Sequence, residues 1–287
     1  MKITVIGASG FIGQPLATAL RARGDEVTTT SLRDPAAAAK NCDGVDVVVN
    51  LAGEPVAQRW TPQVKAKIRA SRVEGAHALI DALATLSVKP KRYVSASAVG
   101  YYGSSETATF VETSSPGDDF LAEICVAWEA AADRAAAYDM RVTKVRTGVV
   151  LGTEGGALAM LLPIFRFGAG GIVASGKQWY SWIHIDDQVG IYLHAIDGTD
   201  GVLNATAPSP VRNNEFTRAL GSALHRPTFL PTPAFAVHLL LGEAASVATQ
   251  GQRVLPERTL STGYRFKYET IDAALRALVG GSTIRFG

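Results

Sequence analysis

Three glycines near the start of the chain have the spacing of a phosphate-binding turn. A short apolar segment that begins at residue 3 leads directly into the run Gly7, Ala8, Ser9, Gly10, Phe11, Ile12 and Gly13. Gly7 permits a tight turn, Gly10 removes a Cβ where a pyrophosphate approaches the backbone, and Gly13 lets the next helix pack closely on the strand. The N-terminus of that helix offers free N–H groups and a partial positive charge. This run therefore predicts a dinucleotide site.

The end of the second predicted strand distinguishes the two pyridine nucleotides. An NAD enzyme usually carries an acidic side chain there, which accepts a hydrogen bond from the ribose 2′-OH. This chain has Ser31, Leu32 and Arg33 instead, and a hydroxyl beside a guanidinium suits a 2′-phosphate. Two alternatives stay open: Asp34 turns inward and serves NAD, or Arg33 is a solvated turn residue. We expect NADP(H) as the cofactor.

The elements that position these residues alternate between strand and helix. Strands are predicted at residues 3–6, 27–30, 45–51, 93–97 and 142–150, and helices at residues 11–23, 62–86 and 120–138. This alternation predicts a parallel sheet with right-handed crossovers. The three valines at residues 47–49 indicate a strand buried on both faces. Residues 34–42 are too few for a full crossover, so we expect one truncated element there.

A change of composition after Gly152 marks a second lobe, because glycines and prolines become frequent. We predict an α/β protein with a Rossmann-type doubly wound parallel sheet and a smaller C-terminal substrate lobe. The NADP-binding domain is placed at residues 1–152, with a returning strand near residues 202–206. The substrate lobe is placed at residues 153–287, including a small C-terminal domain at about 238–285.

The bulk composition argues against several classes of protein. The formal net charge is +2 and the basic residues are scattered, so no nucleic acid or membrane surface is expected as a partner. Two cysteines without a zinc-ligand pattern predict neither a disulfide framework nor a metal site. No secretory signal or membrane-spanning run is evident. We expect a cytoplasmic protein that acts on a small molecule.

Further motifs resemble one superfamily. These are Asn-Leu-Ala-Gly at residues 50–53, Ser-Ala-Ser-Ala at 95–98, Tyr-Tyr-Gly at 101–103 and Trp-Ile-His-Ile-Asp-Asp at 182–187. With the G-x-x-G-x-x-G spacing, they resemble extended short-chain dehydrogenases of the nucleoside-diphosphate-sugar epimerase kind. The runs at residues 59–60, 146–152, 170–178, 204–208 and 251–256 resemble its atypical "epimerase family protein" branch, also called SulA-type. The small C-terminal domain of unknown function belongs to the same resemblance.

The resemblance implies a set of NADP(H) contacts. Besides residues 7–12 and 31–33, it points to Leu51, Ala52 and Gly53 at the end of the third strand. Arg72 is a further candidate, because ordinary members have an asparagine beside the cofactor at this helix position and an arginine adds charge suited to phosphate. Its alternative is an exposed helix residue. Thr147 and Val150 lie where these folds bring backbone groups to the nicotinamide.

The resemblance also implies an unusual catalytic centre. Ordinary members use a Ser/Thr–Tyr–Lys set, with tyrosine and lysine at i and i+4 on one helix. When Glu129 is aligned with the glutamate that follows this pair, the tyrosine position holds Leu121 and the lysine position holds Cys125. No Tyr-x-x-x-Lys occurs anywhere in the chain. The standard acid–base pair is therefore missing.

Three residues remain as catalytic candidates. Ser97 keeps the position that polarises the substrate oxygen, with a hydroxyl that merely satisfies the strand end as its alternative. Tyr101 and Tyr102 are the nearest phenols, and either transfers a proton or packs beneath the site.

Four other polar residues are interpreted as structural. Cys125 is expected to be a buried inert thiol and Glu129 to pair or cap. Glu112, in a polar loop, is expected to be solvated. His184 is expected to begin a helix with Asp186 and Asp187 in its first turn.

The sequence thus predicts an NADP(H)-dependent oxidoreductase or epimerase/dehydratase that acts on a carbonyl or secondary alcohol. The alternative is a non-catalytic NADP(H)-binding regulator or scaffold, because a cofactor site does not by itself prove chemistry. Neither the substrate nor the oligomeric state follows from the residues.

Overall fold

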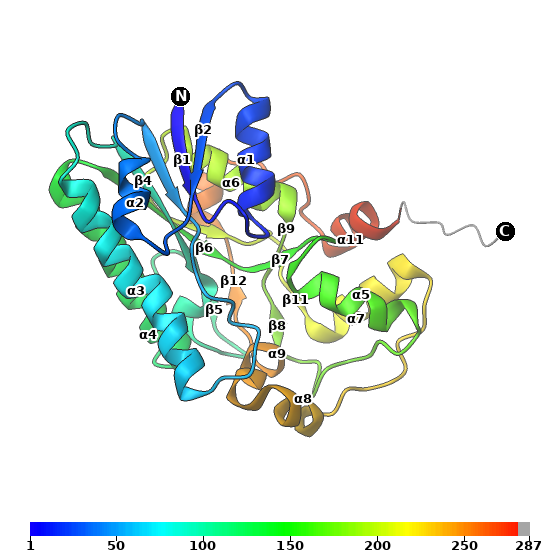
Figure 1. The fold of residues 1–287 in the computed structure, drawn as a ribbon. Helices are drawn as coiled ribbons and strands as arrows, with labels where there is room; N and C mark the ends of the chain where they lie inside the picture. Colours follow the sequence, from blue (N-terminus) through cyan, green and yellow to red (C-terminus); the bar gives the residue numbers. More distant parts are fainter. Residues whose placement is uncertain (281–287) are drawn as a thin grey trace.

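The fold is built around one parallel sheet, as a computed structural model that describes residues 1–280 shows (Figure 1). Its six strands run in the order β10-β6-β4-β3-β1-β2, and every neighbouring pair is parallel. The bounds are β1 Lys2–Ile6, β2 Glu26–Thr30, β3 Val47–Asn50, β4 Arg92–Ala98, β6 Arg141–Thr147 and β10 Gly201–Ala205. The predicted Rossmann-type α/β class is confirmed.

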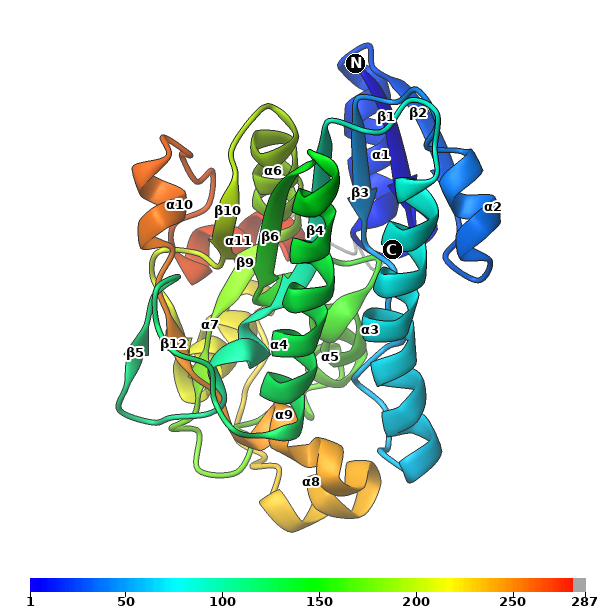
Figure 2. The same ribbon diagram turned by 90° about the vertical axis from the view of Figure 1, so that its left-hand side faces the viewer.

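Helices cover both faces of this sheet (Figures 1 and 2). One face packs on α1 (Gly13–Ala22) and α6 (Ile185–Ile196), and the other on α2 (Pro35–Lys40), α3 (Pro62–Ala84) and α4 (Phe120–Asp133). Val47 and Val49 join the first core and Val48 joins the second. The valine run is therefore buried on both sides, as predicted for a central parallel strand.

The crossover between β2 and β3 contains only the six-residue helix α2. Asp34 precedes it, and its Oδ1 accepts a hydrogen bond from the N–H of Ala37 at 3.0 Å. Pro35 follows at the first helical position, where its missing N–H is harmless. This short helix is the truncated element that the residue count predicted.

The long strand predicted at residues 142–150 is broken in the structure. β6 ends at Thr147, and β7 (Val149–Leu151) leaves the main sheet to pair with β9 (Trp182–His184). At Gly148, the Cβ of any side chain would lie only 2.4 Å from the carbonyl oxygen of Ser181. The close approach of two backbones at a glycine therefore accounts for the break.

Most of the remaining elements form the lobe beside the carboxyl edge of the sheet (Figure 1), whereas η2 (Arg134–Tyr138) packs against α3 and β6, and α10 (Glu257–Ser261) packs against β10. Helices α5, α7 and α11 pack together over Leu158, Phe216 and Leu275. The strand pairs are β8 with β11 and β5 with β12. The bounds are η1 Val99–Tyr102, β5 Thr109–Phe110, η2 Arg134–Tyr138, α5 Gly156–Arg166, β8 Trp179–Tyr180, β11 Val211–Arg212, α7 Asn213–Leu224, α8 Ala234–Leu241, η3 Gly242–Ala245, α9 Ser246–Thr249, β12 Arg253–Val254, α10 Glu257–Ser261 and α11 Ile271–Val279.

The two lobes are not formed by two consecutive stretches of the chain. β10 returns from the second half to the edge of the main sheet, and β12 pairs in parallel with β5 from the first half. Among the described residues, no helix has the length and apolar character needed to cross a lipid bilayer.

Candidate functional site

The glycine run forms the turn between β1 and α1, and each glycine has its own steric reason. Gly7 has a φ of 82°, and a Cβ there would lie 3.1 Å from the backbone of Leu51 and Ala52. A Cβ on Gly13 would lie 2.3 Å from the carbonyl oxygen of Gly7. A Cβ on Gly10 would meet only that same oxygen, at 3.3 Å. Gly7 and Gly13 are thus required by packing, whereas Gly10 keeps the outer side of the turn open.

The turn also presents unpaired N–H groups. Gly10 donates to the carbonyl of Gly7 and Gln14 to that of Gly10, whereas the N–H groups of Phe11 and Ile12 have no protein acceptor among residues 1–280. They lie at the start of α1, where the helix dipole is positive. The ring of Phe11 lies against Gly152, Gly155 and Gly156, where any Cβ would approach it to within 2.9 Å. The glycines after β7 therefore let the turn at residues 7–13, which we call the glycine cradle, pack against the second lobe through Phe11.

The residues after β2 lie next to the glycine turn, because β2 pairs with β1 and the N–H of Gly7 donates to the carbonyl oxygen of Thr30. Arg33 is exposed, and its N–H donates to Ser31 Oγ at 3.3 Å. Leu32 packs inward beside Gly75. Asp34 is exposed as well, but its carboxylate caps α2, so Ser31 and Arg33 are the exposed polar residues here that cap no helix.

Arg72 lies on α3 against the end of β3. Its Nη1 donates to the carbonyl oxygen of Glu54 at 2.8 Å, and its guanidinium lies 5.1 Å from the centroid of the Trp128 ring. A Cβ on Gly53 would lie only 3.0 Å from the guanidinium carbon. The absence of a side chain at residue 53 therefore makes room for this cation. Arg72 is partly buried, so the alternative of an exposed helix residue is wrong.

A cavity of about 480 Å³ opens between the sheet's carboxyl edge and the C-terminal lobe. Thr147 at the end of β6 and Arg72 line it. Its other walls come from the loop before α3, from α3, η1, α4, β8 and the segment from η3 to β12. They include Trp60, Lys65, Ala98, Phe120, Leu121, Cys125, Trp128, Gln178, Trp179 and Glu243.

The positions aligned with the family's tyrosine and lysine both face this cavity, because Leu121 and Cys125 line it. Leucine cannot titrate. Cys125 is buried, and burial raises the pKa of its thiol to about 12, so the thiolate is not populated near neutral pH. The interpretation of Cys125 as an inert thiol is therefore favoured.

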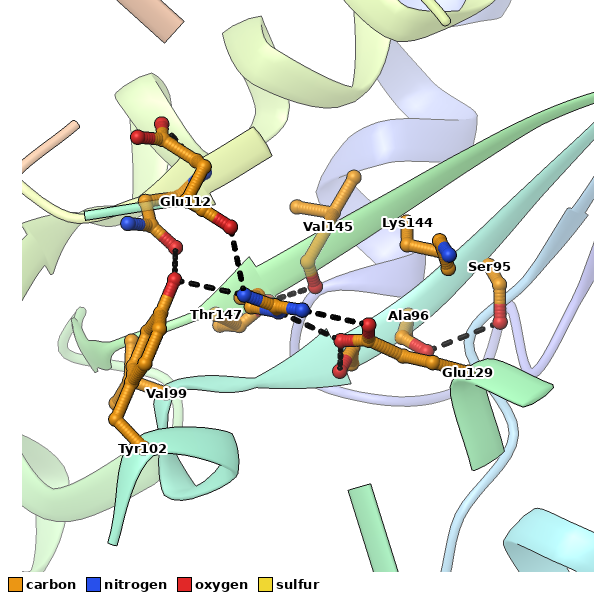
Figure 3. A network of polar contacts seen from close by, with 12 residues as sticks. Ser95, Ala96, Val99, Tyr102, Glu112, Glu129, Lys144, Val145 and Thr147 are labelled. Carbon is orange, nitrogen blue, oxygen red and sulfur yellow. Dashed lines mark hydrogen bonds and ion pairs between the residues drawn. The ribbon is translucent and has the colours of Figure 1, made fainter. Parts of the chain in front are cut away.

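Ser97 and Tyr102 belong to a buried polar cluster rather than to the cavity wall. Figure 3 shows this cluster around Tyr102 and Glu129. Ser97 Oγ donates to Glu129 Oε1 at 2.7 Å, and Arg146 donates to both oxygens of Glu129 at 2.7 and 2.8 Å. Arg146 Nη1 also donates to Tyr102 Oη, which in turn donates to Asn204 Oδ1 at 2.7 Å. For Ser97 the geometry favours the alternative of a hydroxyl satisfied at the strand end.

The two tyrosines differ in their surroundings. Burial raises the pKa of Tyr102 to about 12, with Arg146 acting in the opposite direction, so its phenol keeps the proton at neutral pH. Tyr101 covers the same cluster, since the Arg146 guanidinium lies 3.4 Å from the centroid of its ring. Both phenols thus pack around Arg146, and their role in proton transfer stays a prediction.

The expectation of a solvated Glu112 is wrong. Its side chain is buried and accepts hydrogen bonds from the N–H groups of Asn204, Arg258 and Thr259 at 3.0–3.1 Å. These donors lie far away in sequence, which is why the local polar run gave no sign of them. His184, by contrast, is the N-cap of α6 as predicted, because its Nδ1 accepts from the N–H of Asp186 at 3.0 Å.

Sequence reasoning also missed the partners of Arg146 and Glu129 and the aromatic wall at Trp60 and Phe120. The ring centroids of Trp60 and Phe120 are 5.1 Å apart. The backbone of Val150 was expected near the nicotinamide, and its side chain is part of the core. Only its backbone is left to make such a contact.

The parallel sheet, the glycine cradle and the cavity at the strands' carboxyl ends define a Rossmann-type dinucleotide-binding protein of the extended short-chain dehydrogenase class. Comparison with known proteins gives the family. The profile of the "NAD dependent epimerase/dehydratase family" matches residues 3–205, and that of a "Domain of unknown function (DUF1731)" matches residues 232–278. The chain therefore belongs to the NAD dependent epimerase/dehydratase family.

Relatives match along nearly the whole chain. The Arabidopsis thaliana "Epimerase family protein SDR39U1 homolog, chloroplastic" is 43% identical, over 97% of this chain and 87% of its own length. "Epimerase family protein YfhF" of Bacillus subtilis is 35% identical, over 97% and 98%. The structure of the human epimerase family protein SDR39U1 (isoform 2) with NADPH superimposes with a TM-score of 0.92, at 38% identity, and covers 98% of this chain and 99% of that one.

Proposed function

We propose that this chain is an NADP(H)-dependent oxidoreductase or epimerase/dehydratase that acts on a carbonyl or secondary alcohol. The observation that carries the proposal is the arrangement of three features along the carboxyl edge of one sheet. The exposed Arg33 follows β2, the glycine turn follows the neighbouring β1, and the cavity lies at the ends of β4 and β6. The human relative whose structure contains NADPH supports the same cofactor.

The residues present fit a dinucleotide phosphate. The outer side of Gly10 has no neighbour closer than 3.3 Å to a would-be Cβ, so an oxygen-rich group can approach the backbone. Phe11 and Ile12 would donate their N–H groups to it. Ser31 and Arg33 would hold a ribose 2′-phosphate, because Arg33 is exposed and Asp34 is occupied as a helix cap.

When bound, NADP(H) supplies or accepts a hydride at its nicotinamide. The chain's own contribution is to orient the two reactants and exclude water. Thr147 and Arg72 border the cavity from the sheet side, and the aromatic residues Trp60, Phe120 and Trp179 enclose it. Because Ser97 is committed to Glu129, we assign the binding of a substrate oxygen to the guanidinium of Arg72.

Cofactor titration tests the proposal. We expect NADPH to bind at least about tenfold more tightly than NADH, as measured by isothermal titration calorimetry. Arg33→Ala is expected to weaken NADPH binding by about 10- to 100-fold and to leave NADH unchanged, because one charge-assisted contact is lost. Arg69→Ala, an exposed arginine on α3, is the matched control. A preference for NADH, or no binding of either nucleotide, contradicts the proposal.

The missing Tyr–Lys pair supports a second candidate, a cofactor-binding regulator or scaffold without turnover. Such a protein would bind NADPH yet fail to oxidise it with any member of a panel of aldehydes, ketones and 2-oxo acids. Turnover of one compound would favour the enzyme, provided that a variant with a blocked cavity loses this turnover. Gly100→Trp, beside Leu121, would block the cavity.

A further inference from the structure

Within the described part of the chain, the cavity contains one cation whose charge is not paired. Of its lining residues, Lys65 and Arg72 are basic. Lys65 forms an ion pair with Glu243. Arg72 forms no ion pair with any of residues 1–280. Burial lowers the pKa of Arg72, with Cys125 and Glu54 acting in the opposite direction. A half-buried guanidinium without a carboxylate is unfavourable unless a ligand completes it.

The hydrogen bonds of Arg72 leave part of its donor set free. Its bonds all come from Nη1, to Glu54 O, Ile68 O and Ser71 Oγ. Across residues 1–280, Nη2 and Nε have no acceptor, and neither has the indole N–H of Trp128 beneath the guanidinium. The bond to Glu54 O is short, at 2.8 Å, and the other two contacts are long, at 3.4 and 3.5 Å, so Nη1 anchors the guanidinium mainly through Glu54. The free N–H groups of Arg72 and Trp128 can thus bind one ligand group that accepts hydrogen bonds and carries negative charge.

The rest of the cavity is mainly apolar, with some uncharged polar side chains such as Gln178 and Ser246, and the charges of Lys65 and Glu243 balance. Trp60 and Phe120 pack edge to face, Trp179 closes the side of the second lobe, and Ile68 and Ile124 fill the gaps. The acidic lining residues are Asp119, which caps α4, and Glu243, which holds Lys65. A nucleoside diphosphate would bring two negative charges here, and the walls formed by the described residues offer one free cation.

From these observations we infer that the substrate is a small, mainly apolar or aromatic monocarboxylate whose carboxyl group is bound by Arg72, and that it is not a nucleoside-diphosphate sugar. The inference rests on the proposed function, because it places the substrate in the same cavity. It departs from structures that share only this fold, such as the Thermotoga maritima UDP-glucose 4-epimerase with UDP-glucose, 18% identical with a TM-score of 0.81.

A binding experiment on NADPH-loaded protein tests the inference without requiring turnover. The probes are acetate, phenylacetate and indole-3-acetate, their matched alcohols ethanol, 2-phenylethanol and indole-3-ethanol, and UDP-glucose. We expect an aromatic carboxylate to bind about tenfold or more tightly than its alcohol, acetate to bind more weakly, and UDP-glucose not to compete. Tighter binding of UDP-glucose, or no binding of any carboxylate, overturns the inference.

Variants at residue 72 test whether Arg72 is the group that binds the carboxylate. Arg72→Gln should abolish the preference for carboxylate over alcohol while the Kd for NADPH changes less than about threefold, and Arg72→Lys should retain part of the preference. Arg69→Gln, one turn earlier and paired with Glu74, is the control for net charge. If Arg72→Gln weakens NADPH instead, Arg72 serves a cofactor phosphate and the inference is wrong. Failure of wild-type protein to bind NADPH would refute the proposed function itself.

Discussion

The phosphate cradle and the Ser97–Glu129–Arg146–Tyr102 cluster both lie at strands of the same sheet, but they use different parts of the polypeptide. The cradle is made of backbone, and its glycines matter for the side chains they lack. The cluster is made of side chains from β4, α4, β6 and η1 that satisfy one another out of contact with water. The cradle is therefore open to a ligand, whereas the cluster is already complete without one.

This comparison changes the interpretation of the motif at residues 95–98. A serine at the end of β4 resembles a catalytic group in sequence. Here its hydroxyl completes an ion pair that fastens α4 to β6. The groups that face the cavity at the same level are the aliphatic, thiol and guanidinium side chains of Leu121, Cys125 and Arg72.

Removing the carboxylate of the cluster should have the largest effect. Glu129→Ala is expected to lower the free energy of unfolding by about 3–5 kcal/mol, because Arg146 would stay buried with no counter-charge. Urea unfolding followed by circular dichroism measures this. Glu123→Ala, exposed on the same helix, should cost no more than about 1 kcal/mol. Equal losses for the two variants would mean that the cluster is not a stabilising unit.

Two alanine substitutions separate packing from ligand approach in the cradle. Gly13→Ala should destabilise the fold by about 1–3 kcal/mol and weaken NADPH binding, because its Cβ would collide with the Gly7 carbonyl. Gly10→Ala should leave the unfolding free energy within about 1 kcal/mol of wild type. It should raise the Kd for NADPH about tenfold or more, because the methyl group faces the ligand. An unchanged Kd for Gly10→Ala would contradict the assignment of the cradle.

A smaller effect is expected at Ser97. Ser97→Ala should cost about 1 kcal/mol of stability, since Glu129 keeps its bonds to Arg146, and NADPH affinity should not change. Ser95→Ala, on the same strand with its hydroxyl on the Ala96 carbonyl, is the control. If Ser97→Ala alone abolishes turnover of a substrate while stability and cofactor affinity persist, the hydroxyl acts on the substrate and the comparison fails.

The smallest signal is the titration of Tyr102. Its folded-state pKa is about 12, above the usual value of about 10 in an unfolded chain. The folded protein thus holds this proton more tightly, so its contribution to stability is complete below about pH 10 and disappears as the pH rises towards about 12. Phenolate absorbance of wild type and Tyr102→Phe should therefore differ only above about pH 11. A difference that is already present below about pH 10 would show an activated phenol.

The predictable parts of the molecule are those encoded locally. The turn at residues 7–13, the doubly buried valines of β3 and the caps at Asp34 and His184 each depend on neighbours within a few residues. Their patterns predict them because the physical cause and the residue lie in the same stretch of chain.

The cavity and the buried charges could not be predicted in the same way. Glu112 receives its donors from residues 92 to 147 positions away, and Arg146 meets Tyr102 across 44 positions. In a polar run such a carboxylate looks solvated, because only the tertiary fold reveals that N–H groups converge on it. Gly53 offered a hint, since a glycine beside a predicted cofactor strand indicates that another group approaches closely.

The convergence of donors on Glu112 has a consequence for how the chain can be divided. Two of its N–H donors come from the start of α10, close after the strand β12 that pairs with β5. A protein shortened before residue 252 would lose these donors. The Glu112 carboxylate in the first half would then lack two of its backbone hydrogen bonds. The C-terminal segment therefore stabilises the nucleotide-binding half by satisfying its buried carboxylate, and the two halves are expected to fold and unfold together.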